Sequence, residues 1–403
     1  MALTKVITGV TDLNQAQSTN GLKFPTGDVF AGTPEEGMIR NDQSQASEGS
    51  ASTMQFYNGT AWKNFVNRDP TPLGSDNFNT VLYTGNNSTK NVTGVGFQPD
   101  FTWIKARDNG TGNHALTDSV RGTGSGNGLA SNTSGPEGQY SAAYGYLSAF
   151  GADGFTVQAG STSPNFVNSS AANYVAWNWK AGGASVSNTD GTITSDVSAN
   201  TAAGFSIVKW SGNDLASQTI GHGLSSTPEL YIIKKTSATL GWQVNLSSLV
   251  TGTEGYLLLD RDLSMYTTFP NYYTSANSTV LSTNGTSTAE RLYNNQSAEY
   301  IAYCFHSVAG YSKIGSYTGA VGKSVNVGFE PRFIMFKNTS SSNSWWIYDE
   351  ARGDDKRLFA DLSNPESTSS SLTTSSTGFS FNDANSNLNA AGNVYIYMAF
   401  AAT

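Results

Sequence analysis

Strand-like patterns of apolar and polar residues dominate the chain, and three stretches share the same anchors at nearly fixed offsets. VGFQPDFTWIKAR (95–107), HGLSSTPELYIIKK (222–235) and VGFEPRFIMFKN (327–338) each place a lysine six residues after a proline. Each copy opens with an aromatic–hydroxyl–glycine triplet and closes with an aromatic strand, YVAWNW (174–179), YIAYCF (300–305) or YIYMAF (395–400). Such aligned anchors indicate an internal repeat, a signal that outranks local patterns.

The spacing of the copies predicts domains rather than short repeat units. Pro99, Pro228 and Pro331 lie 129 and 103 residues apart, well beyond the roughly 20–50 residues of solenoid or propeller repeats. A unit of this size can bury a core of its own. We therefore predict three domains of one fold, at residues 76–182, 204–310 and 311–403.

The residue pattern also predicts the fold class. No segment carries a 3.6-residue apolar period over three turns, whereas β-branched and aromatic residues fill runs such as 101–105 and 395–398. Clusters of Gly, Asn and Ser interrupt these runs at short intervals. The prediction is an all-β protein with three tandem β-sandwich domains, jelly-roll-like. The aromatic residues repeated in every closing strand are expected in the core: Trp179, Phe305, Phe400, Tyr174, Tyr300 and Tyr395.

Residues 1–75 differ from the repeats and predict an attachment or oligomerisation segment. Asn58-Gly59, a strong hairpin signal, is flanked by Phe56, Tyr57 and Trp62. The segment has too few apolar side chains for a core of its own, and oligomerisation is a usual remedy. These three aromatic residues are therefore the predicted assembly contacts. Residues 69–72 and 181–203 are predicted to be linkers.

Composition and charge limit the classes of molecule that the protein can bind. Charged residues make up 13% of the chain, the net charge is −8 and the isoelectric point is near 4.9, which argues against nucleic acid. No apolar run is long enough to span a membrane, and the first residues lack the apolar core of a signal peptide. We expect synthesis in the cytoplasm, without export through the secretory pathway and without membrane insertion. Cys304 lies among aromatic residues and is expected to be buried.

The amino-terminal text GTPEEGMIRND and MQFYNGTAWKNF resembles the amino-terminal segments of phage tail-fibre and other virion appendage proteins. WIKARDNGTGNHALTDSVRG (103–122), together with GFTV (154–157) and NYVAWNWKAGG (173–183), resembles a domain common in tail proteins of marine phages. The third copy keeps the Asp-x-x-Arg-Gly element of the first (118–122 and 349–353), whereas the second lacks it. The resemblance implies a virion role, trimers like those of tail fibres, and no established catalytic residues.

Candidate chemistry is sparse. His114, His222 and His306 fall at different places within the repeat, so no shared histidine site is predicted. Carboxylate pairs serve glycosidases, and the third copy has such a cluster: Asp349, Glu350, Asp354 and Asp355. Asp118 and Asp349 each precede an arginine by three residues, at Arg121 and Arg352, which favours a structural ion pair over acid–base catalysis.

The sequence also contains candidates for two kinds of binding site. Residues 383–387 alternate oxygen ligands like the start of a calcium loop but lack its Gly and Glu, and residues 108–113 are similar; turns are the favoured interpretation of both. Aromatic residues peculiar to one copy are the candidates for sugar contact, although a core role is favoured even for these: Trp242, Tyr272, Tyr273, Trp345 and Trp346.

The function predicted from the sequence is a non-enzymatic structural protein of a virion, a trimeric tail fibre or adhesin that contacts the host surface and its glycans. The alternatives are a capsid fibre or decoration protein, and a polysaccharide-degrading tail spike. Other virion proteins are the expected partners. No catalytic residue, metal or cofactor is predicted.

Overall fold

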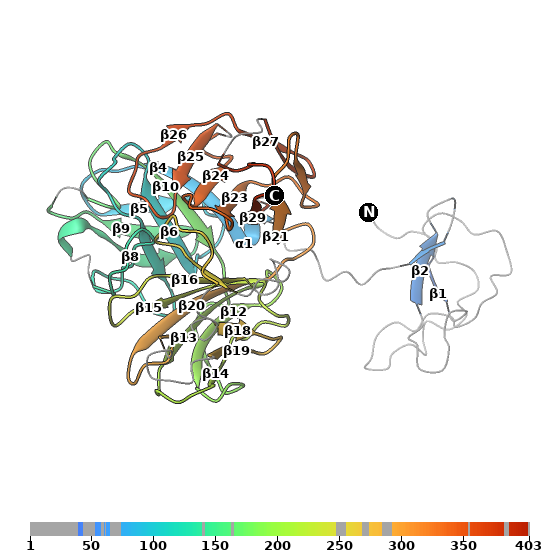
Figure 1. Cartoon of the computed structure of the whole chain (residues 1–403), viewed down its shortest axis with the longest axis horizontal. Coiled ribbons are helices and arrows are strands. Elements are labelled where there is room, and N and C mark those ends of the chain that lie inside the picture. Colours follow the sequence, from blue (N-terminus) through green and yellow to red (C-terminus); the bar gives the residue numbers. More distant parts are fainter. Residues whose placement is uncertain are drawn as a thin grey trace, which may run out of the picture. The chain divides into compact units, whose positions relative to one another are not determined.

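The computed structural model describes residues 39–42, 53–57, 60, 62–64 and 74–401, with gaps at 139–141, 163–164, 247–254, 268–273, 284–291, 354 and 383–386. The chain forms two compact units, Met1–Asp69 and Pro70–Thr403 (Figure 1). Regular structure is almost entirely antiparallel β, which confirms the predicted fold class. The helices described are α1 (Gly74–Asn77) and a 3-10 turn, Ala142–Tyr144.

The amino-terminal unit contains one small antiparallel sheet. Its strands are β1 (Ile39–Asp42), β2 (Thr53–Tyr57) and β3 (Trp62–Asn64), in that order across the sheet. Tyr57 pairs with Trp62, so β2 and β3 are paired as a hairpin predicts; Asn58 and Gly59 lie outside the described residues. The side chains of Phe56, Tyr57 and Trp62 lie outside the described structure, as does the linker predicted at 69–72, so their assembly role stays a prediction.

Each copy in the larger unit is a sandwich of two antiparallel sheets built from seven equivalent strands. The first copy has β4 (Phe78–Thr84), β5 (Lys90–Thr93), β6 (Phe101–Ala106), β7 (Ala115–Asp118), β8 (Tyr146–Gly151), β9 (Gly154–Gln158) and β10 (Asn173–Trp179). The second has β13 (Phe205–Ser211), β14 (Thr219–Gly221), β15 (Leu230–Lys235), β16 (Gln243–Leu246), β18 (Thr274–Ala276), β19 (Val280–Thr283) and β20 (Glu299–Phe305). The third has β21 (Ser312–Thr318), β22 (Ser324–Asn326), β23 (Phe333–Asn338), β24 (Trp346–Asp349), β27 (Leu372–Ser375), β28 (Gly378–Phe381) and β29 (Val394–Phe400).

The sheets have the same strand order in every copy. The larger sheets contain β4-β10-β6-β7, β13-β20-β15-β16 and β21-β29-β23-β24, and the smaller sheets are β5-β9-β8, β14-β19-β18 and β22-β28-β27. The larger sheet of the second copy also includes β17 (Tyr256–Leu258), and that of the third includes β25 (Lys356–Phe359) and β26 (Ser367–Thr368). In Figure 1 the labelled strands of the second copy lie in the lower part of the larger unit, and those of the first and third copies lie in its upper part.

Register places the repeated prolines at equivalent points of this topology. Pro99, Pro228 and Pro331 each stand two residues before a strand whose first residue pairs with the last residue of the closing strand. Those pairs are Phe101 with Trp179, Leu230 with Phe305 and Phe333 with Phe400. The repeat in the sequence is thus a repeat of strand pairing.

The segment 181–203 is not the linker that its lack of aromatic residues predicted. It forms β11 (Val186–Asn188) and β12 (Ser195–Asn200), which extend the larger sheet of the second copy beyond β13. Val197 is buried in the core of that copy, and Ser195 and Ser198 are buried as well. Small and polar residues alternate here because the segment is an outer part of the sheet, where few large side chains are needed.

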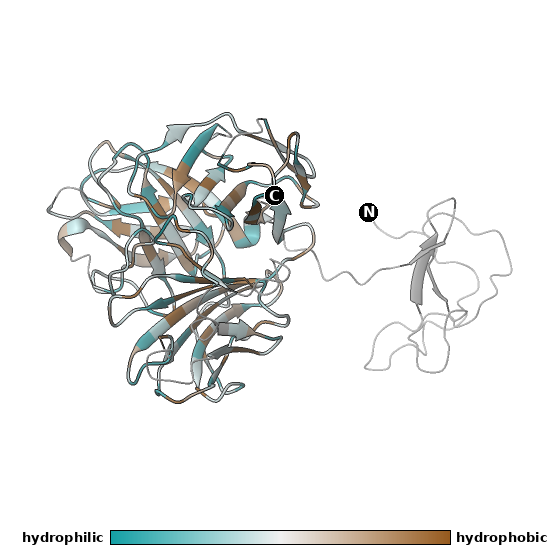
Figure 2. Ribbon diagram, in the orientation of Figure 1, coloured by the Kyte–Doolittle hydropathy of each residue, from teal (hydrophilic) through white to brown (hydrophobic). Residues whose placement is uncertain are grey.

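The closing strands are buried on both faces. In β10, Tyr174 and Ala176 enter the first copy's own sandwich core, whereas Val175, Trp177 and Trp179 enter a second cluster. The strands β20 and β29 divide their side chains in the same way. Both faces therefore take mostly aliphatic and aromatic residues, which explains why these strands do not alternate between apolar and polar positions. Figure 2 shows hydrophobic segments, in brown, along strands of the larger unit.

That second cluster is common to all three copies. It contains residues from the larger sheet of each copy, and Trp179, Phe305 and Phe400 meet within it. Their ring centroids are separated by 6.5 Å (Trp179–Phe305), 5.8 Å (Trp179–Phe400) and 6.1 Å (Phe305–Phe400). These predicted core residues are 2%, 2% and 1% exposed. Each copy thus has its own sandwich core and also a share in a central one.

Three equivalent backbone hydrogen bonds join the copies head to tail. The amide of Glu137 in the first copy donates to the carbonyl of Thr236 in the second (2.8 Å), and Met265 in the second donates to Thr339 in the third (3.0 Å). Glu366 in the third then donates to Arg107 in the first (2.6 Å). The contacts are heterologous and close into a ring of three. We call these the first–second, second–third and first–third boundaries.

Because Phe400 packs against the first and second copies as well as its own, truncation should destabilise the whole larger unit. Phe400→Ala is expected to lower the free energy of unfolding by about 3–5 kcal/mol, measured by chemical denaturation. Phe150→Ala, at the half-buried edge of the first sandwich, serves as the control and should cost less than half as much. Equal losses for the two variants would contradict the shared core.

Candidate functional site

The aromatic residues proposed for sugar contact are built into the interior where the structure describes them. Trp242, Trp345 and Trp346 are 0%, 1% and 4% exposed. Trp346 stacks on Tyr348, contacts Phe359 edge-on and lies under the guanidinium of Arg357. Burial leaves no ring face for a sugar, so these three are not supported as ligand contacts. Tyr272 and Tyr273 lie outside the described residues.

Trp242 and Trp345 occupy the same structural position as His114. Each of the three lies immediately before the fourth strand of its copy, which is β16, β24 or β7. Each uses a ring nitrogen to reach a backbone carbonyl of another copy. Trp242 Nε1 donates to Ala130 O and Thr133 O (both 3.0 Å), and Trp345 Nε1 donates to Leu258 O (2.9 Å). These contacts run from the second copy to the first and from the third to the second.

His114 completes the set at the first–third boundary. Trp103 Nε1 donates to its Nδ1 (2.7 Å), so the proton of the neutral ring lies on Nε2, which donates to Phe359 O (2.9 Å) and Leu362 O (3.1 Å). Burial, followed by repulsion from Lys105, lowers the pKa of His114 to about 3. The ring is therefore a neutral structural link at ordinary pH.

The other two histidines also contact backbone groups. His222 Nε2 lies 3.0 Å from Asn277 O, and its Nδ1 accepts from the amide of Leu224. His306 Nδ1 lies 3.1 Å from Ser307 O. These partners fit structural roles. His114 lies in another copy, whereas His306 is near enough to His222 to add to burial in lowering the pKa of His222.

The Asp-x-x-Arg elements are buried ion pairs that fix a turn, which confirms that interpretation. Asp118 Oδ1 accepts from the amides of Val120 and Arg121, while its Oδ2 lies 2.5 Å from Arg121 Nε. Asp349 and Arg352 repeat the arrangement in the third copy, also at 2.5 Å and without exposure of either side chain. Such a pair costs desolvation and is sustained by its additional hydrogen bonds.

Each of these aspartates also receives a hydrogen bond from a neighbouring copy. Tyr303 OH of the second copy donates to Asp118 Oδ2 (2.8 Å), and Trp177 Nε1 of the first donates to Asp349 Oδ2 (2.9 Å). In the second copy the strand register puts Leu246 at the equivalent place. The matching residue of the third copy's closing strand is Met398, which has no donor. The second copy thus lacks the Asp-x-x-Arg element, and the residue that would face it across the second–third boundary, Met398, is apolar.

The acidic cluster of the third copy does not become a carboxylate pair. Asp349 is buried against Arg352, whereas Glu350 contacts Arg332 and Asp355 contacts Lys356 (3.0 Å) at the surface. Asp354 lies outside the described residues. Two carboxylates facing one bond are the requirement for glycoside hydrolysis, and the described members of this cluster are directed to different cations.

The repeated lysines are the remaining polar anchor, and all three are fully buried. Lys234 Nζ donates to Ser134 O of the first copy (2.9 Å), and Lys337 Nζ donates to Asp262 O of the second (3.0 Å). Lys105 Nζ bonds within its own copy, to Ala106 O (2.8 Å). Burial lowers the pKa of each lysine to about 8, against a smaller opposing effect of nearby aspartates.

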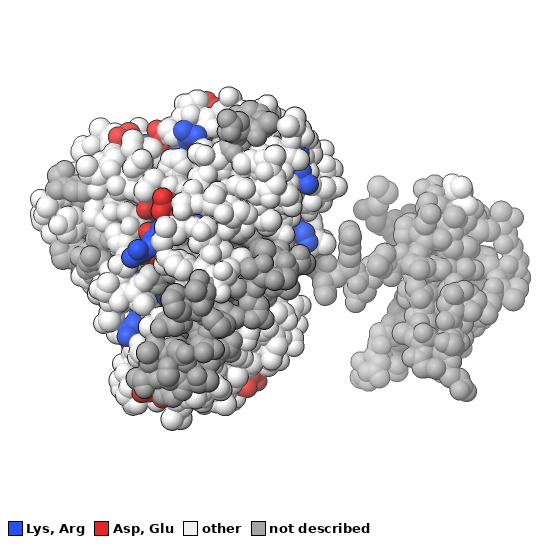
Figure 3. Space-filling model, viewed as in Figure 1, with Lys and Arg blue, Asp and Glu red and all other residues white. Residues whose placement is uncertain are grey.

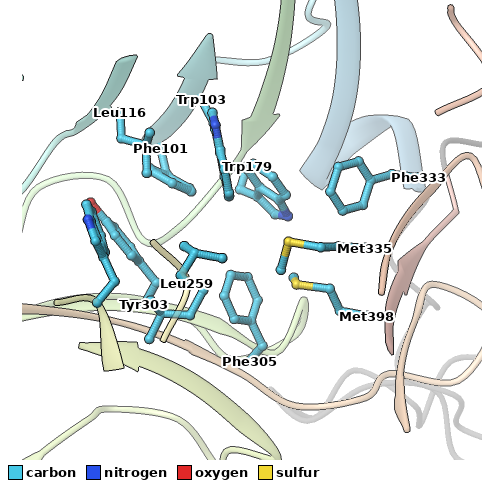
Figure 4. Close-up of a pocket in the computed structure, with 12 residues that line it drawn as sticks. Phe101, Trp103, Leu116, Trp179, Leu259, Tyr303, Phe305, Phe333, Met335 and Met398 are labelled. Carbon is cyan, nitrogen blue, oxygen red and sulfur yellow. The ribbon is translucent and has the colours of Figure 1, made fainter. Parts of the chain in front are cut away.

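A small apolar cavity of about 10 Å³ lies within the shared core, lined by residues of all three copies (Figure 4). Trp179, Phe305 and Phe333 surround it together with the side chains of Met335 and Met398. Its volume is at the lower limit for one water molecule, and an apolar lining gives water no partner. It is a packing defect where three sheets meet, too small for a ligand.

The first–third boundary carries the other cavity of note, an open cleft of about 380 Å³ lined by Arg107, Asp108, Asn173, Pro365 and Glu366. Arg107 and Glu366 form a bidentate pair across the boundary, with Nε–Oε2 and Nη2–Oε1 both 2.9 Å. Asp108 Oδ2 accepts from the amide (2.9 Å) and the side chain (3.1 Å) of Asn173. The cleft offers an exposed carboxylate and amide to a polar ligand.

Sequence reasoning missed this charged set, although the repeat contained the signal. Arg107 corresponds to Thr236 and Thr339, and Asp108 corresponds to Ser237 and Ser340. In all three copies the first amide of the closing strand donates to the side chain at the Asp108 position. Comparing the copies position by position would have shown where charge replaces a hydroxyl.

The candidate metal loops divide between the described and undescribed parts. Residues 108–113 form the predicted turn, in which Asn109 Oδ1 accepts from the amide and hydroxyl of Thr111. Most of 383–387 lies outside the described residues. Among those described, no three metal-ligating side chains gather, and no helix is long and apolar enough to cross a membrane. The face in Figure 3 is largely uncharged, with scattered acidic and basic groups.

Fold and boundaries together define an all-β protein in which three sandwich copies form one closed ring around a shared core. Residues 73–403 match the family described as a domain of unknown function, DUF7483, and the chain belongs to that family. No curated protein and no solved structure matches the chain. The family spans the whole ring, so its unit is the set of three copies and not one sandwich.

The buried lysines predict a rise in stability above neutral pH. The folded pKa of about 8 lies below the ordinary 10.5, so the unfolded chain binds more protons between these values and stability increases with pH. The urea midpoint should rise from pH 7.5 to 9, before tyrosine and cysteine ionisation opposes it. Lys234→Met should reduce the slope by about one third; an unchanged slope would contradict the assignment.

Proposed function

We propose that this protein is a non-enzymatic structural component of a virion, a tail fibre or adhesin that contacts the host surface. Support comes first from the resemblance of residues 32–65 to the amino-terminal segments of virion appendage proteins. The repeats, above all the first, also resemble a domain of phage tail proteins, although the second copy lacks the Asp-x-x-Arg-Gly element. The proposal includes homotrimers, contact with host glycans, and synthesis in the host cytoplasm before incorporation into particles.

The observation that carries the proposal is the use of the repeated polar residues. The lysines, the Asp–Arg elements and the ring nitrogens at the His114 position are buried and bonded to other parts of the fold, in most cases across a boundary. Buried polar groups that are hydrogen-bonded within the fold stabilise a scaffold and are not available to a substrate. Surface loops, which differ among the copies, are left for recognition.

A division of labour between the two units follows from their composition. The amino-terminal unit, Met1–Asp69, is separate from the ring and has little apolar mass. A segment of this kind gains stability from a partner chain or another virion protein. It is the proposed attachment unit, while the ring faces outward. A capsid fibre or decoration protein would use the same division, and location in the particle separates these alternatives.

Deletion of residues 1–69 tests the division. The shortened chain should keep the ring's near-ultraviolet signal and thermal transition but be absent from purified particles, because the attachment unit is gone. The full chain, expressed in the same way, is the control, and labelled particles imaged by electron microscopy give its position on tail or capsid. Normal incorporation of the shortened chain would contradict the proposal.

The enzymatic alternative has its own readout. Host envelope glycans incubated with the full chain should keep their length, as followed by gel filtration. Shortened glycans would mean that the protein is a polysaccharide-degrading spike and not a non-enzymatic adhesin, whatever the outcome of the deletion.

A further inference from the structure

The three boundaries of the ring are built on one plan but differ in polar content. At the second–third boundary, Met265, Leu246 and Met398 stand where the first–second boundary has Glu137, Asp118 and Tyr303. None of the three residues at the second–third boundary is charged. At the first–second boundary, Glu137 binds Arg121 of its own copy (2.7 Å), and Tyr303 reaches Asp118 across the boundary. Interfaces between similar modules become specific when each carries polar groups that the wrong partner leaves unpaired.

Of the three boundaries, the first–third has the strongest charged contact between copies. Glu366 binds Arg352 of its own copy (3.3 Å) just as Glu137 binds Arg121, and it also holds Arg107 of the first copy through two bonds. The position of Arg107 is a threonine at both other boundaries. Arg107 and Glu366 have side-chain exposures of only 22% and 13%. A bidentate, partly desolvated pair is stronger and more directional than an exposed one.

This boundary is also the only one of the three whose copies are not consecutive in the chain. Arg107 and Glu366 lie 259 residues apart. Copies that follow one another stay close because a short segment joins them, and 306–311 is all that separates β20 from β21. The third copy has no such tether to the first. A first copy from a second chain presents the same surface, which is the condition for exchange of equivalent modules between chains.

We propose that the Arg107–Glu366 pair is the closing contact of the ring, selecting the first copy of the same chain as partner for the third. When the pair is lost, the surface around Glu366 accepts the first copy of a second chain, and exchanged oligomers form. The partner that fits this surface is therefore a second copy of this protein. The inference is independent of the proposed virion role.

Arg107→Thr in the full chain tests this proposal, because it gives the first–third boundary the residue that both other boundaries carry. Arg332→Thr is the matched control, since it removes an ion pair with Glu350 that lies within the third copy. Both variants and the parent chain are unfolded, refolded at low and high concentration, and examined by native mass spectrometry. Amide hydrogen exchange is measured on the same samples before unfolding.

In Arg107→Thr, amides near 107–113 and 359–366 should exchange about tenfold faster, with no change at the other two boundaries. Refolding at high concentration should yield additional oligomers that the parent chain and Arg332→Thr do not form. Arg107→Lys, which keeps the charge but not the bidentate geometry, should be intermediate. Behaviour of Arg107→Thr like that of Arg332→Thr would overturn the proposal, and so would faster exchange without new oligomers.

Discussion

The contact of Trp179, Phe305 and Phe400 is the interaction on which the rest of the structure depends. Each ring ends a closing strand, and each comes from a different copy. The three can meet only if the larger sheets turn their outer faces toward one another, which buries those faces and removes three apolar surfaces from water. The copies are therefore sandwiches that cannot keep this face exposed, and the ring is the arrangement that covers all three at once.

Because the larger sheets are buried on both faces, polar groups in their interior have no contact with water. Backbone and side-chain donors in the interior need partners, and the ring supplies many of them from a neighbouring copy. Lys234, Lys337, Trp242 and Trp345 all donate to carbonyls across a boundary. Trp179 Nε1 and Tyr311 OH are among the described buried groups that have no hydrogen-bond partner. Trp179 lies where the three sheets meet, and its ring contacts those of Phe333, Phe305 and Phe400.

The sequence was sufficient for the repeat, the sandwich fold and the burial of the closing aromatic residues, because these depend on strand periodicity and spacing within one copy. It did not show that the copies share a core. YVAWNW and YIYMAF lack alternation, and a continuous apolar run does not say what covers its second face. Nor did spacing reveal that Asp118 and Asp349 are bonded to other copies, or that 181–203 forms strands. Those outcomes depend on contacts between residues distant in sequence.

The shared core should make residues 70–403 fold as one cooperative unit, and not as three independent sandwiches. Differential scanning calorimetry of the full chain tests this most directly, because it compares the measured enthalpy with that implied by the sharpness of the transition. One transition for the ring, with a ratio of calorimetric to van't Hoff enthalpy of about 1, is the predicted result. Separate transitions, or a ratio near about 3, would contradict the account.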